Sequence, residues 1–413
     1  MINAISNPLV SFKSVNFTLF FFGSMLTASA SWILATALPL LVLELTNDIE
    51  LVGIIFAVYF LPSLIFTLFS GVIIDALGRE KIVLYFAQIG GFLVLSIVSL
   101  CLFYDYMTFG LLLFFVVIQG VFNSIDYPAR HSFVRILIKD KAHLSNAVSL
   151  MAVISGLSRI MGPSMAALII ASLGLYYCFV FAALFCLPAL LSFVFIKITF
   201  YTEQKDLTKN FFKSISTAFS YAKRHDILLT SFLIFFIVAL FVPNYAVSIS
   251  ALVKMSFKAS DEDFAYVMSF LGVGALIGAS LNALRKHRTS MCLIFLTAIG
   301  SIICIGASAF TNSIFVLGLC LAGTGFFFVI FTNLVITCIQ THGSMKFRGR
   351  MMSIYTLIYF STAPVGMYLS GELADKLGAR TALLVSSGFC LAITILLLMY
   401  KIFARNFIKN ARS

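Results

Sequence analysis

Long stretches without a charged residue alternate along this chain with short charged segments. An α-helix rises about 1.5 Å per residue and needs about 20 apolar residues to cross the hydrocarbon core of a bilayer, so each such stretch is a candidate membrane span. The charge-free runs are 14–43, 51–74, 82–104, 106–125, 160–196, 227–253, 264–284, 289–345, 351–371 and 381–400.

Two of these runs are too long for a single crossing. The run 289–345 contains a turn-like Thr-Asn-Ser at 311–313, and the run 160–196 contains Leu-Gly-Leu at 173–175. The first helix of the latter run reaches back to about His143. Dividing both runs turns ten stretches into twelve predicted spans.

The composition supports a membrane protein. Hydrophobic residues make up 61% of the 413 and charged residues only 11%, which lies outside the range of soluble proteins. One long polar connection, 198–226, divides the spans into two sets of six. The sequence therefore predicts an all-α membrane protein with two pseudo-symmetric six-helix bundles, 1–197 and 227–413.

The positive charges are unevenly distributed over the connections. The chain has 28 Lys and Arg against 16 Asp and Glu, a net charge of +12, and most of the basic residues fall in alternate loops. The positive-inside rule then places those loops and both termini in the cytoplasm. These charges are explained as topological anchors, so we expect no nucleic-acid partner.

A second interpretation of the N-terminus is a signal peptide. Lys13 precedes an apolar run that ends in Ala28-Ser29-Ala30, which resembles a cleavage site. Cleavage there would remove most of the first span and leave eleven, so we favour the twelve-span interpretation.

Polar residues inside spans are costly and therefore informative. In the helix that begins in 106–125, Gln119, Asn123, Asp126 and Arg130 follow at spacings of four, three and four, and so share one face. This face could line a substrate cavity or could hold neighbouring helices together by hydrogen bonds. Shorter polar faces in the first, seventh and tenth spans comprise Ser24, Thr27 and Ser31; Asn244 and Ser248; and Asn333, Thr337 and Gln340.

Arg159 is expected near the middle of the membrane. It lies thirteen residues beyond Asn146, about 20 Å along one helix. Its charge could attract an anionic group of the substrate, such as the carboxylates or catecholates of a siderophore. Alternatively it has a permanent structural partner, with Asp126 or nearby carbonyls as candidates.

Asp126 is the acidic residue predicted within a span, one helical turn before Arg130. Burial favours the neutral acid and a neighbouring guanidinium favours the carboxylate, so this group could be poised to exchange a proton. Our hypothesis is that protonation of Asp126 releases Arg130 or Arg159 and couples proton entry to substrate exit. The alternative is a static ion pair between the two.

A repeated motif suggests a gate. Gly-x-x-x-Asp-x-x-Gly occurs at 71–78, followed by Arg79, and again at 371–378, in loops that face opposite sides of the membrane. Asp75 and Arg79 are predicted to meet Arg348 and Arg350 at the start of the eleventh span and to close the cytoplasmic side. A simple tight turn is the alternative.

Several strings resemble the major facilitator superfamily and, within it, the branch of the enterobactin exporter and macrolide efflux pumps. The resemblance covers nearly the whole chain apart from the connection between the bundles. It is carried by GVIIDALGREK (71–81), YPARHSFV (127–134), LSNAVSLMAVISGLSRIMGPSMAALI (144–169), FRGRMMSIYTL (347–357) and GELADKLGAR (371–380).

This resemblance implies a twelve-helix inner-membrane transporter in which the first, fourth, seventh and tenth spans line a central cavity. The superfamily's antiporter signature is present with Gly162 and Pro163, which we assign to gating, and with Ala167 in place of a glycine. The superfamily's Arg in the fourth span is replaced by Val116.

The predicted function is export of a small amphipathic, anionic molecule, with a siderophore or metallophore ahead of a drug, by alternating access and proton antiport. The alternatives are import of a siderophore-like molecule and a lysophospholipid or lipid carrier. We expect a monomer in the bilayer, with protons as a second partner. No enzyme activity, cofactor or metal site is expected, and the eight cysteines show no C-x-x-C spacing.

Overall fold

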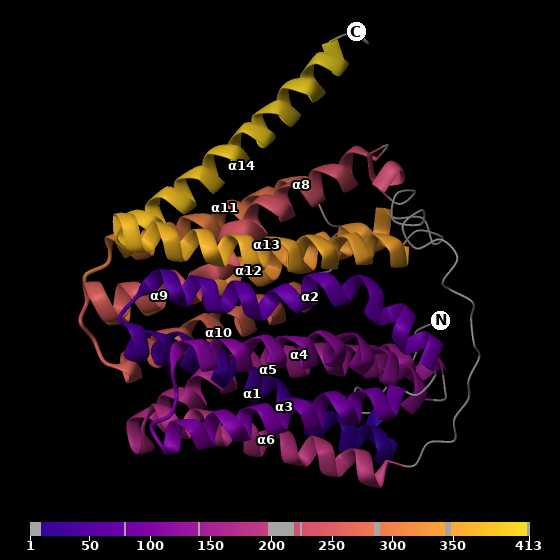
Figure 1. Cartoon of the computed structure of the whole chain (residues 1–413). Coiled ribbons are helices and arrows are strands. Elements are labelled where there is room, and N and C mark those ends of the chain that lie inside the picture. The colour runs from indigo at the N-terminus through magenta and orange to yellow at the C-terminus, as the bar shows by residue number, and fades with distance from the viewer. Residues whose placement is uncertain are drawn as a thin grey trace. The chain divides into compact units, whose positions relative to one another are not determined.

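The computed structural model describes residues 10–77, 80–138, 141–196, 219–223, 225–284, 290–342 and 348–410, and in these ranges every regular element is a helix. The chain divides into two compact units (Figure 1). Unit 1 comprises Met1–Asn47 and Val58–Lys209, and unit 2 comprises Asp48–Ala57 and Asn210–Ser413.

Unit 1 holds the helices of the first half of the chain. A short 3-10 helix, η1 (Val10–Lys13), precedes α1, and its Ser11 hydroxyl donates to Asn146 Oδ1 at 2.7 Å. The α-helices are α1 (Val15–Thr46), α2 (Ile49–Leu77), α3 (Glu80–Phe103), α4 (Phe109–Leu137), α5 (Lys141–Leu173) and α6 (Leu175–Phe195). The part of α2 that belongs to unit 1 begins at residue 58.

Helix α1 packs against α5 and α6, while α3 packs against α4 and α6. A β-carbon on Gly23 would lie only 2.8 Å from Ala189 Cα, so glycine allows α1 and α6 to approach closely. Aromatic rings of Phe20, Phe133 and Phe193 pack with one another at centroid distances of 5.3 to 6.3 Å and are buried. The Ala28–Ala30 segment lies in the middle of α1, and Ala30 is buried against α3 and α6.

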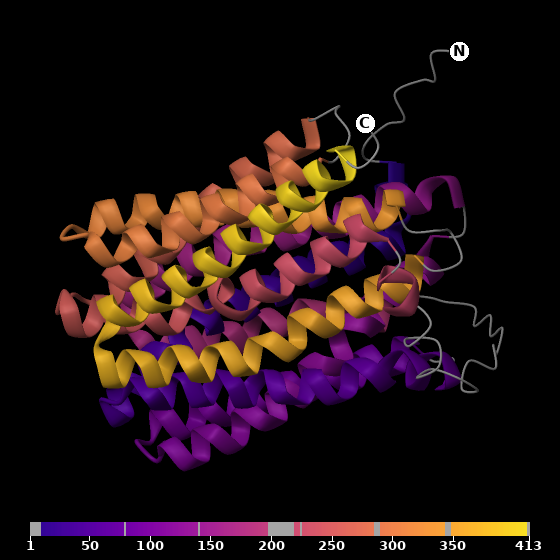
Figure 2. The ribbon, with the colours of Figure 1, turned by 90° about the horizontal axis from the view of Figure 1, so that it is seen from above.

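Unit 2 holds the second half of the chain, and its last helix, α14 (Ala379–Asn410, yellow in Figure 2), packs against α8 (Asp226–Phe241) among others. Residues 48–57 belong to this unit because they pack on α13: a β-carbon on Gly53 would lie 2.7 Å from the carbonyl oxygen of Met367. Its further elements are α8 (Asp226–Phe241), η2 (Val242–Asn244), α9 (Tyr245–Ala251), η3 (Leu252–Ser256), α10 (Asp261–Leu284), α11 (Met291–Ala307), η4 (Ser308–Phe310), α12 (Ile314–His342), α13 (Arg348–Leu377) and α14 (Ala379–Asn410).

The predicted seventh span, 227–253, is not one regular helix. A 3-10 segment that contains Pro243 separates α8 from α9, and a π-helical turn, η3, follows. Proline has no backbone N–H and prevents the regular α-helical hydrogen bond at its position. The span therefore has a break near its middle.

The fold class predicted from the sequence is confirmed. Within the described ranges, ten helices are long and apolar enough to cross a membrane. The other two predicted spans, 51–74 and 351–371, fall in α2 and α13, so each of the twelve predicted spans corresponds to a helical segment. The bundle boundaries at 197 and 227 stay a prediction, and most of the predicted connection 198–226 lies outside the described residues.

Candidate functional site

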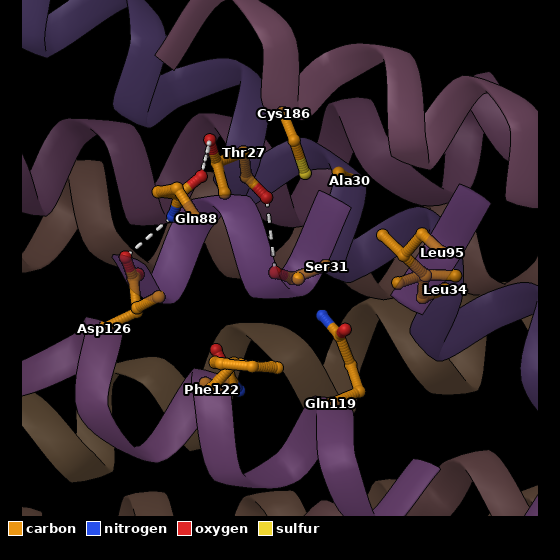
Figure 3. A pocket seen from close by; sticks show the side chains of 13 residues that line it. Thr27, Ala30, Ser31, Leu34, Gln88, Leu95, Gln119, Phe122, Asp126 and Cys186 are labelled. Carbon is orange, nitrogen blue, oxygen red and sulfur yellow. Dashed lines mark hydrogen bonds between the residues drawn. The ribbon is translucent and has the colours of Figure 1, made fainter. Parts of the chain in front are cut away.

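A chain of polar side chains crosses unit 1 from α1 through α3 to α4 (Figure 3). The Thr27 hydroxyl lies 3.4 Å from Gln88 Oε1, to which it can donate, and Gln88 Nε2 donates to Asp126 Oδ1 at 2.7 Å. Asp126 Oδ2 accepts from Arg130 Nε at 3.0 Å and from Nη2 at 2.7 Å. The Asp126 carboxylate thus contacts α3 directly and is connected to α1 through Gln88.

The Asp126–Arg130 pair is largely removed from solvent. The two side chains are 13% and 12% exposed. Arg130 Nη1 is buried and has no hydrogen-bond partner within the described part of the chain. Helical spacing of four residues brings the two groups together, as the sequence predicts. Low exposure strengthens their attraction but also makes any change of charge here expensive.

A small cavity, partly open to solvent, lies beside this chain of side chains. Gln119 reaches it from α4, and its Oε1 is buried without a hydrogen-bond partner among the described residues. The lining comes from α1, α3, α4 and α6. Its residues are Thr27, Ala30, Ser31, Leu34, Ala87, Gln88, Gly91, Leu95, Gln119, Phe122, Asn123, Asp126 and Cys186.

Five of the residues predicted from sequence therefore line one cavity: Thr27, Ser31, Gln119, Asn123 and Asp126. Asn123 Nδ2 also donates to the hydroxyl of Tyr59 on α2 at 2.9 Å. Gly120 lets α4 approach this part of α2, since a β-carbon there would lie 2.4 Å from the carbonyl oxygen of Tyr59. The polar face of α4 thus holds helices together and lines a cavity at once.

Arg159 lies apart from this chain and has an aromatic partner. Its guanidinium carbon is 5.1 Å from the centroid of the Trp32 ring on α1. Asp126, which sequence reasoning considered as its partner, is bonded to Arg130 instead. No salt bridge to Arg159 is formed by any carboxylate of the described residues. Arg159 is not among the residues that line the cavity.

The predicted gating pair Gly162 and Pro163 is buried in α5 at its crossing with α1. A β-carbon on Gly162 would lie 2.2 Å from Trp32 Cβ. The other predicted gating residues are not placed: Asp75 lies in α2 and Arg348 and Arg350 in the first turn of α13, but their side chains, and all of Arg79, lie outside the described residues.

In unit 2, Asn244 marks the break between α8 and α9. It is 1% exposed, its amide donates to Leu240 O, and its Oδ1 has no partner among the described residues. A second small cavity adjoins the break. Ser248 is the sequence candidate on its wall, together with Phe241, Val242, Tyr245, Ile305, Ser370, Leu383, Ser386, Ser387 and Cys390.

The predicted polar face of the tenth span lies on α12. Asn333 and Thr337 are half-buried, Gln340 is exposed, and the Thr337 hydroxyl donates to Asn333 O at 2.8 Å. None of the three lines either cavity.

Sequence reasoning missed two residues of the unit 1 site, Gln88 and Trp32. Gln88 is the only amide in the charge-free run 82–104, and Trp32 is the only tryptophan of the chain. Because polar side chains are rare within membrane spans, Gln88 could have been identified from the sequence. Nothing in the local sequence points from Trp32 to Arg159, because the contact depends on how α1 and α5 cross.

Comparison with known proteins gives a consistent family assignment. A family model described as "Transmembrane secretion effector" matches residues 6–411. Among solved structures, the nucleoside transporter NupG superposes with a TM-score of 0.74 at 13% identity and covers 93% of this chain and 98% of its own. That likeness establishes the fold.

Three relatives of known sequence are transporters by description. The uncharacterized MFS-type transporter YfiS of Bacillus subtilis (strain 168) is 27% identical over 84% of this chain and 82% of its own. The multidrug efflux pump Tap of Mycolicibacterium fortuitum is 24% identical over 89% and 91%. The Staphyloferrin A transporter of Staphylococcus aureus (strain NCTC 8325 / PS 47) is 24% identical over 87% and 89%.

Proposed function

Because the chain belongs to the transmembrane secretion effector family of MFS-type transporters, we propose that it exports a small, amphipathic, anionic molecule by alternating access and proton antiport. The observation that carries this proposal is the buried Asp126–Arg130 pair beside the unit 1 cavity. We assign proton exchange to this carboxylate because it is the acidic group that lines a partly open cavity in unit 1.

The charges of unit 1 support an anionic substrate. Asp126 and Arg130 neutralise each other, whereas Arg159 rests on the face of Trp32 and keeps its net positive charge. A cation–π contact attracts a guanidinium but does not cancel its charge. A carboxylate or catecholate group of a substrate could pair with the Arg159 guanidinium.

The relatives favour export of a metal-chelating or drug-like compound. One is described as a multidrug efflux pump and another as the Staphyloferrin A transporter. Both share about a quarter of their residues with this chain. We favour a siderophore-like substrate because its anionic groups match Arg159, and this choice places the chain near the enterobactin and macrolide exporters suggested by the sequence.

The proposed cycle uses the acid–base state of Asp126. Protonation of Asp126 from outside releases Arg130 or Arg159 and is coupled to exit of the anion, so the proton and the anion are not bound at the same time. Loss of the proton to the cytoplasm restores the pair. Asp75 and Arg79 would close the cytoplasmic side against Arg348 and Arg350, and such a latch can bias the two states only by its differential energy, typically a few kcal/mol.

This proposal also fixes the location and partners of the protein. We place it in the inner membrane as a monomer, with both termini in the cytoplasm and the protons of the membrane gradient as its second substrate. Asn333, Thr337, Gln340, Asn244 and Ser31 are further proposed substrate contacts.

The decisive experiment uses purified protein in proteoliposomes. An imposed inside-acid gradient should drive accumulation of a citrate-based carboxylate siderophore, whereas accumulation under an inside-alkaline gradient would indicate symport and import. A cationic drug and a labelled lysophospholipid serve as competing substrates. Accumulation of either in place of the anion would contradict the proposed substrate class.

Asp126→Asn should abolish gradient-driven uptake. Glu372→Gln is the matched control, because Glu372 pairs with the exposed Lys376 at the end of α13 and contacts neither cavity. Full gradient-driven transport by Asp126→Asn would reject proton coupling at this residue.

A further inference from the structure

The side chain of Gln88 joins α1 to α4, and both ends of its amide are engaged (Figure 3). Nε2 donates to Asp126 Oδ1 at 2.7 Å, and Oε1 lies 3.4 Å from the Thr27 hydroxyl. The residue is 5% exposed and lies on the wall of the unit 1 cavity. A buried amide with both groups paired is held in one orientation by its neighbours.

The two oxygens of Asp126 are not equivalent. Oδ2 accepts two hydrogen bonds from Arg130, whose guanidinium is a permanent donor, so a proton has no place there. A proton taken up by Asp126 must therefore bind Oδ1. In that state the new O–H and the Gln88 N–H would be two donors that face each other across 2.7 Å.

Rotation of the Gln88 amide by half a turn removes this mismatch. Oε1 then accepts from the Asp126 O–H, and Nε2 faces the Thr27 hydroxyl, which can accept while it donates to Gly23 O at 3.0 Å. Both orientations satisfy every group of the Thr27–Gln88–Asp126 chain. The amide is thus a two-state element whose orientation follows the charge of Asp126.

The other groups that face Asp126 have their own partners. Arg130 binds Oδ2, the Tyr59 hydroxyl on α2 accepts from Asn123, and the Cys186 thiol on α6 donates to Ala182 O at 3.5 Å. From α5, the charged Arg159 lies over Trp32. Within the described ranges, Gln88 is the contact of Asp126 that can exchange a donor for an acceptor in place.

We propose that Gln88 is a positioning residue whose amide orientation changes with the protonation of Asp126 and thereby changes the hydrogen bond to Thr27 on α1. When Asp126 Oδ1 binds a proton, the amide turns, and the hydrogen bond at Thr27 changes direction on the cavity wall. The proton stays on Asp126 throughout, and the amide neither gains nor loses one. This inference rests on the proposed proton coupling and adds the route by which the cavity senses it.

Two substitutions separate this role from simple packing. Gln88→Met keeps the size of the side chain but removes both hydrogen-bonding groups. Gln88→Glu, in its acid form, offers a carbonyl acceptor and an O–H donor in nearly the same places, whereas its ionised form would repel Asp126. Ser99→Ala is the control on α3, because Ser99 is buried and bonds only to Leu95 O of its own helix.

Transport is measured in proteoliposomes as gradient-driven uptake and as substrate exchange without a gradient, with the citrate-based siderophore as the probe. In Gln88→Met, gradient-driven uptake should fall about tenfold or more while exchange stays within about twofold, since one buried hydrogen-bond relay is lost and the cavity is kept. Gln88→Glu should recover coupling at acidic pH and lose it at alkaline pH, and Ser99→Ala should match the wild type.

A pH-difference infrared spectrum of the purified protein gives a readout that does not depend on transport. The carboxylic C=O band that disappears in Asp126→Asn should rise together with a change in a glutamine amide band that disappears in Gln88→Met. If the acid band rises with no amide change, the relay is wrong.

The transport results distinguish the two proposals. Wild-type coupling in Gln88→Met beside an uncoupled Asp126→Asn overturns the relay and leaves proton antiport standing. Equal loss of exchange and gradient-driven uptake in Gln88→Met shows a packing role and also overturns it. Full coupling in Asp126→Asn rejects the proposed function itself, while the infrared experiment still tests the relay.

Discussion

Arg159 carries its charge within α5 on the face of an aromatic ring. A guanidinium over a tryptophan face gains about 0.5–1 kcal/mol at exposed sites and about 2 kcal/mol or more when desolvated. The 5.1 Å separation from the Trp32 centroid lies within the range of such contacts. This contact holds the guanidinium in place without pairing it with a carboxylate of the described residues.

Removing the ring should therefore destabilise the protein through Arg159. We expect Trp32→Leu to lower the free energy of unfolding by about 1–2 kcal/mol more in the wild-type background than in the Arg159→Gln background. Thermal unfolding of the purified protein for the four members of this cycle measures the difference. Trp32→Phe keeps an aromatic face and should retain part of the coupling, whereas strictly additive effects would show that the ring and the guanidinium do not interact.

Arg159→Gln should also weaken transport of the anionic substrate. Loss of one favourable charge contact worth about 1.4 kcal/mol corresponds to a tenfold higher KM. Competition by anionic and neutral analogues of the siderophore probe checks the cause, because only the anion should lose affinity. Equal loss for both analogues would point to a general change in the cavity.

At the scale of helices, the crossing of α1 and α5 depends on a missing side chain. A β-carbon at Gly162 would lie 2.2 Å from Trp32 Cβ and 3.0 Å from the Trp32 carbonyl carbon, and these atoms belong to or adjoin the backbone. The helices must separate to admit a methyl group. Gly156 on the same helix offers a matched comparison, since a β-carbon there would meet nothing within 4 Å.

Gly162→Ala should destabilise the protein by about 1–3 kcal/mol, as overpacking of a tight contact does. Gly156→Ala should be neutral or slightly stabilising, because alanine is the better helix former. Thermal unfolding midpoints of the two variants test the contrast. Equal midpoints would mean that α1 and α5 separate at little cost.

The start of α14 is held by Arg380. Gly378, with φ of +80°, supplies the turn from α13, and Arg380 then donates to Ala309 O at 3.1 Å and to Asn312 Oδ1 at 3.0 Å. Its guanidinium carbon also lies 5.6 Å from the Phe257 centroid. The basic residue of the second motif copy thus ties α14 to the connection between α11 and α12.

Arg380→Gln should lower the free energy of unfolding by about 1.5–3 kcal/mol, the range for hydrogen bonds of a charged group. Lys376→Gln, four residues earlier, removes an ion pair with Glu372 that is largely solvated, and it should cause no measurable change. Chemical or thermal unfolding of both variants gives the comparison. A smaller effect for Arg380→Gln than for Lys376→Gln would contradict this account.

The elements were predictable to different degrees for a physical reason. Charge-free runs located the spans because the bilayer fixes how long an apolar helix must be. The break at 242–244 was not predicted, since Pro243 lies inside an unbroken apolar run. The Asp126–Arg130 pair followed from spacing on one helix, whereas Gln88 and Trp32 depend on how neighbouring helices are placed.

At the scale of the whole molecule, the uneven distribution of Lys and Arg predicts which connections face the cytoplasm and which face outside. The positive-inside rule places the connection before α11 in the cytoplasm and the turn between α3 and α4 outside. Of the eight cysteines, all within described segments, Cys292 at the start of α11 is exposed, and the others are buried or half-buried. Tyr106, in the turn between α3 and α4, is 74% exposed and offers a matched external position.

A membrane-impermeant maleimide should therefore label the two positions from opposite sides. In spheroplasts that express the protein, Tyr106→Cys in a Cys292→Ser background should react, and Cys292 of the wild type should not. In everted membrane vesicles the pattern should reverse, because the cytoplasmic face is then exposed to the reagent. Labelling of Cys292 in intact spheroplasts would invert the topology.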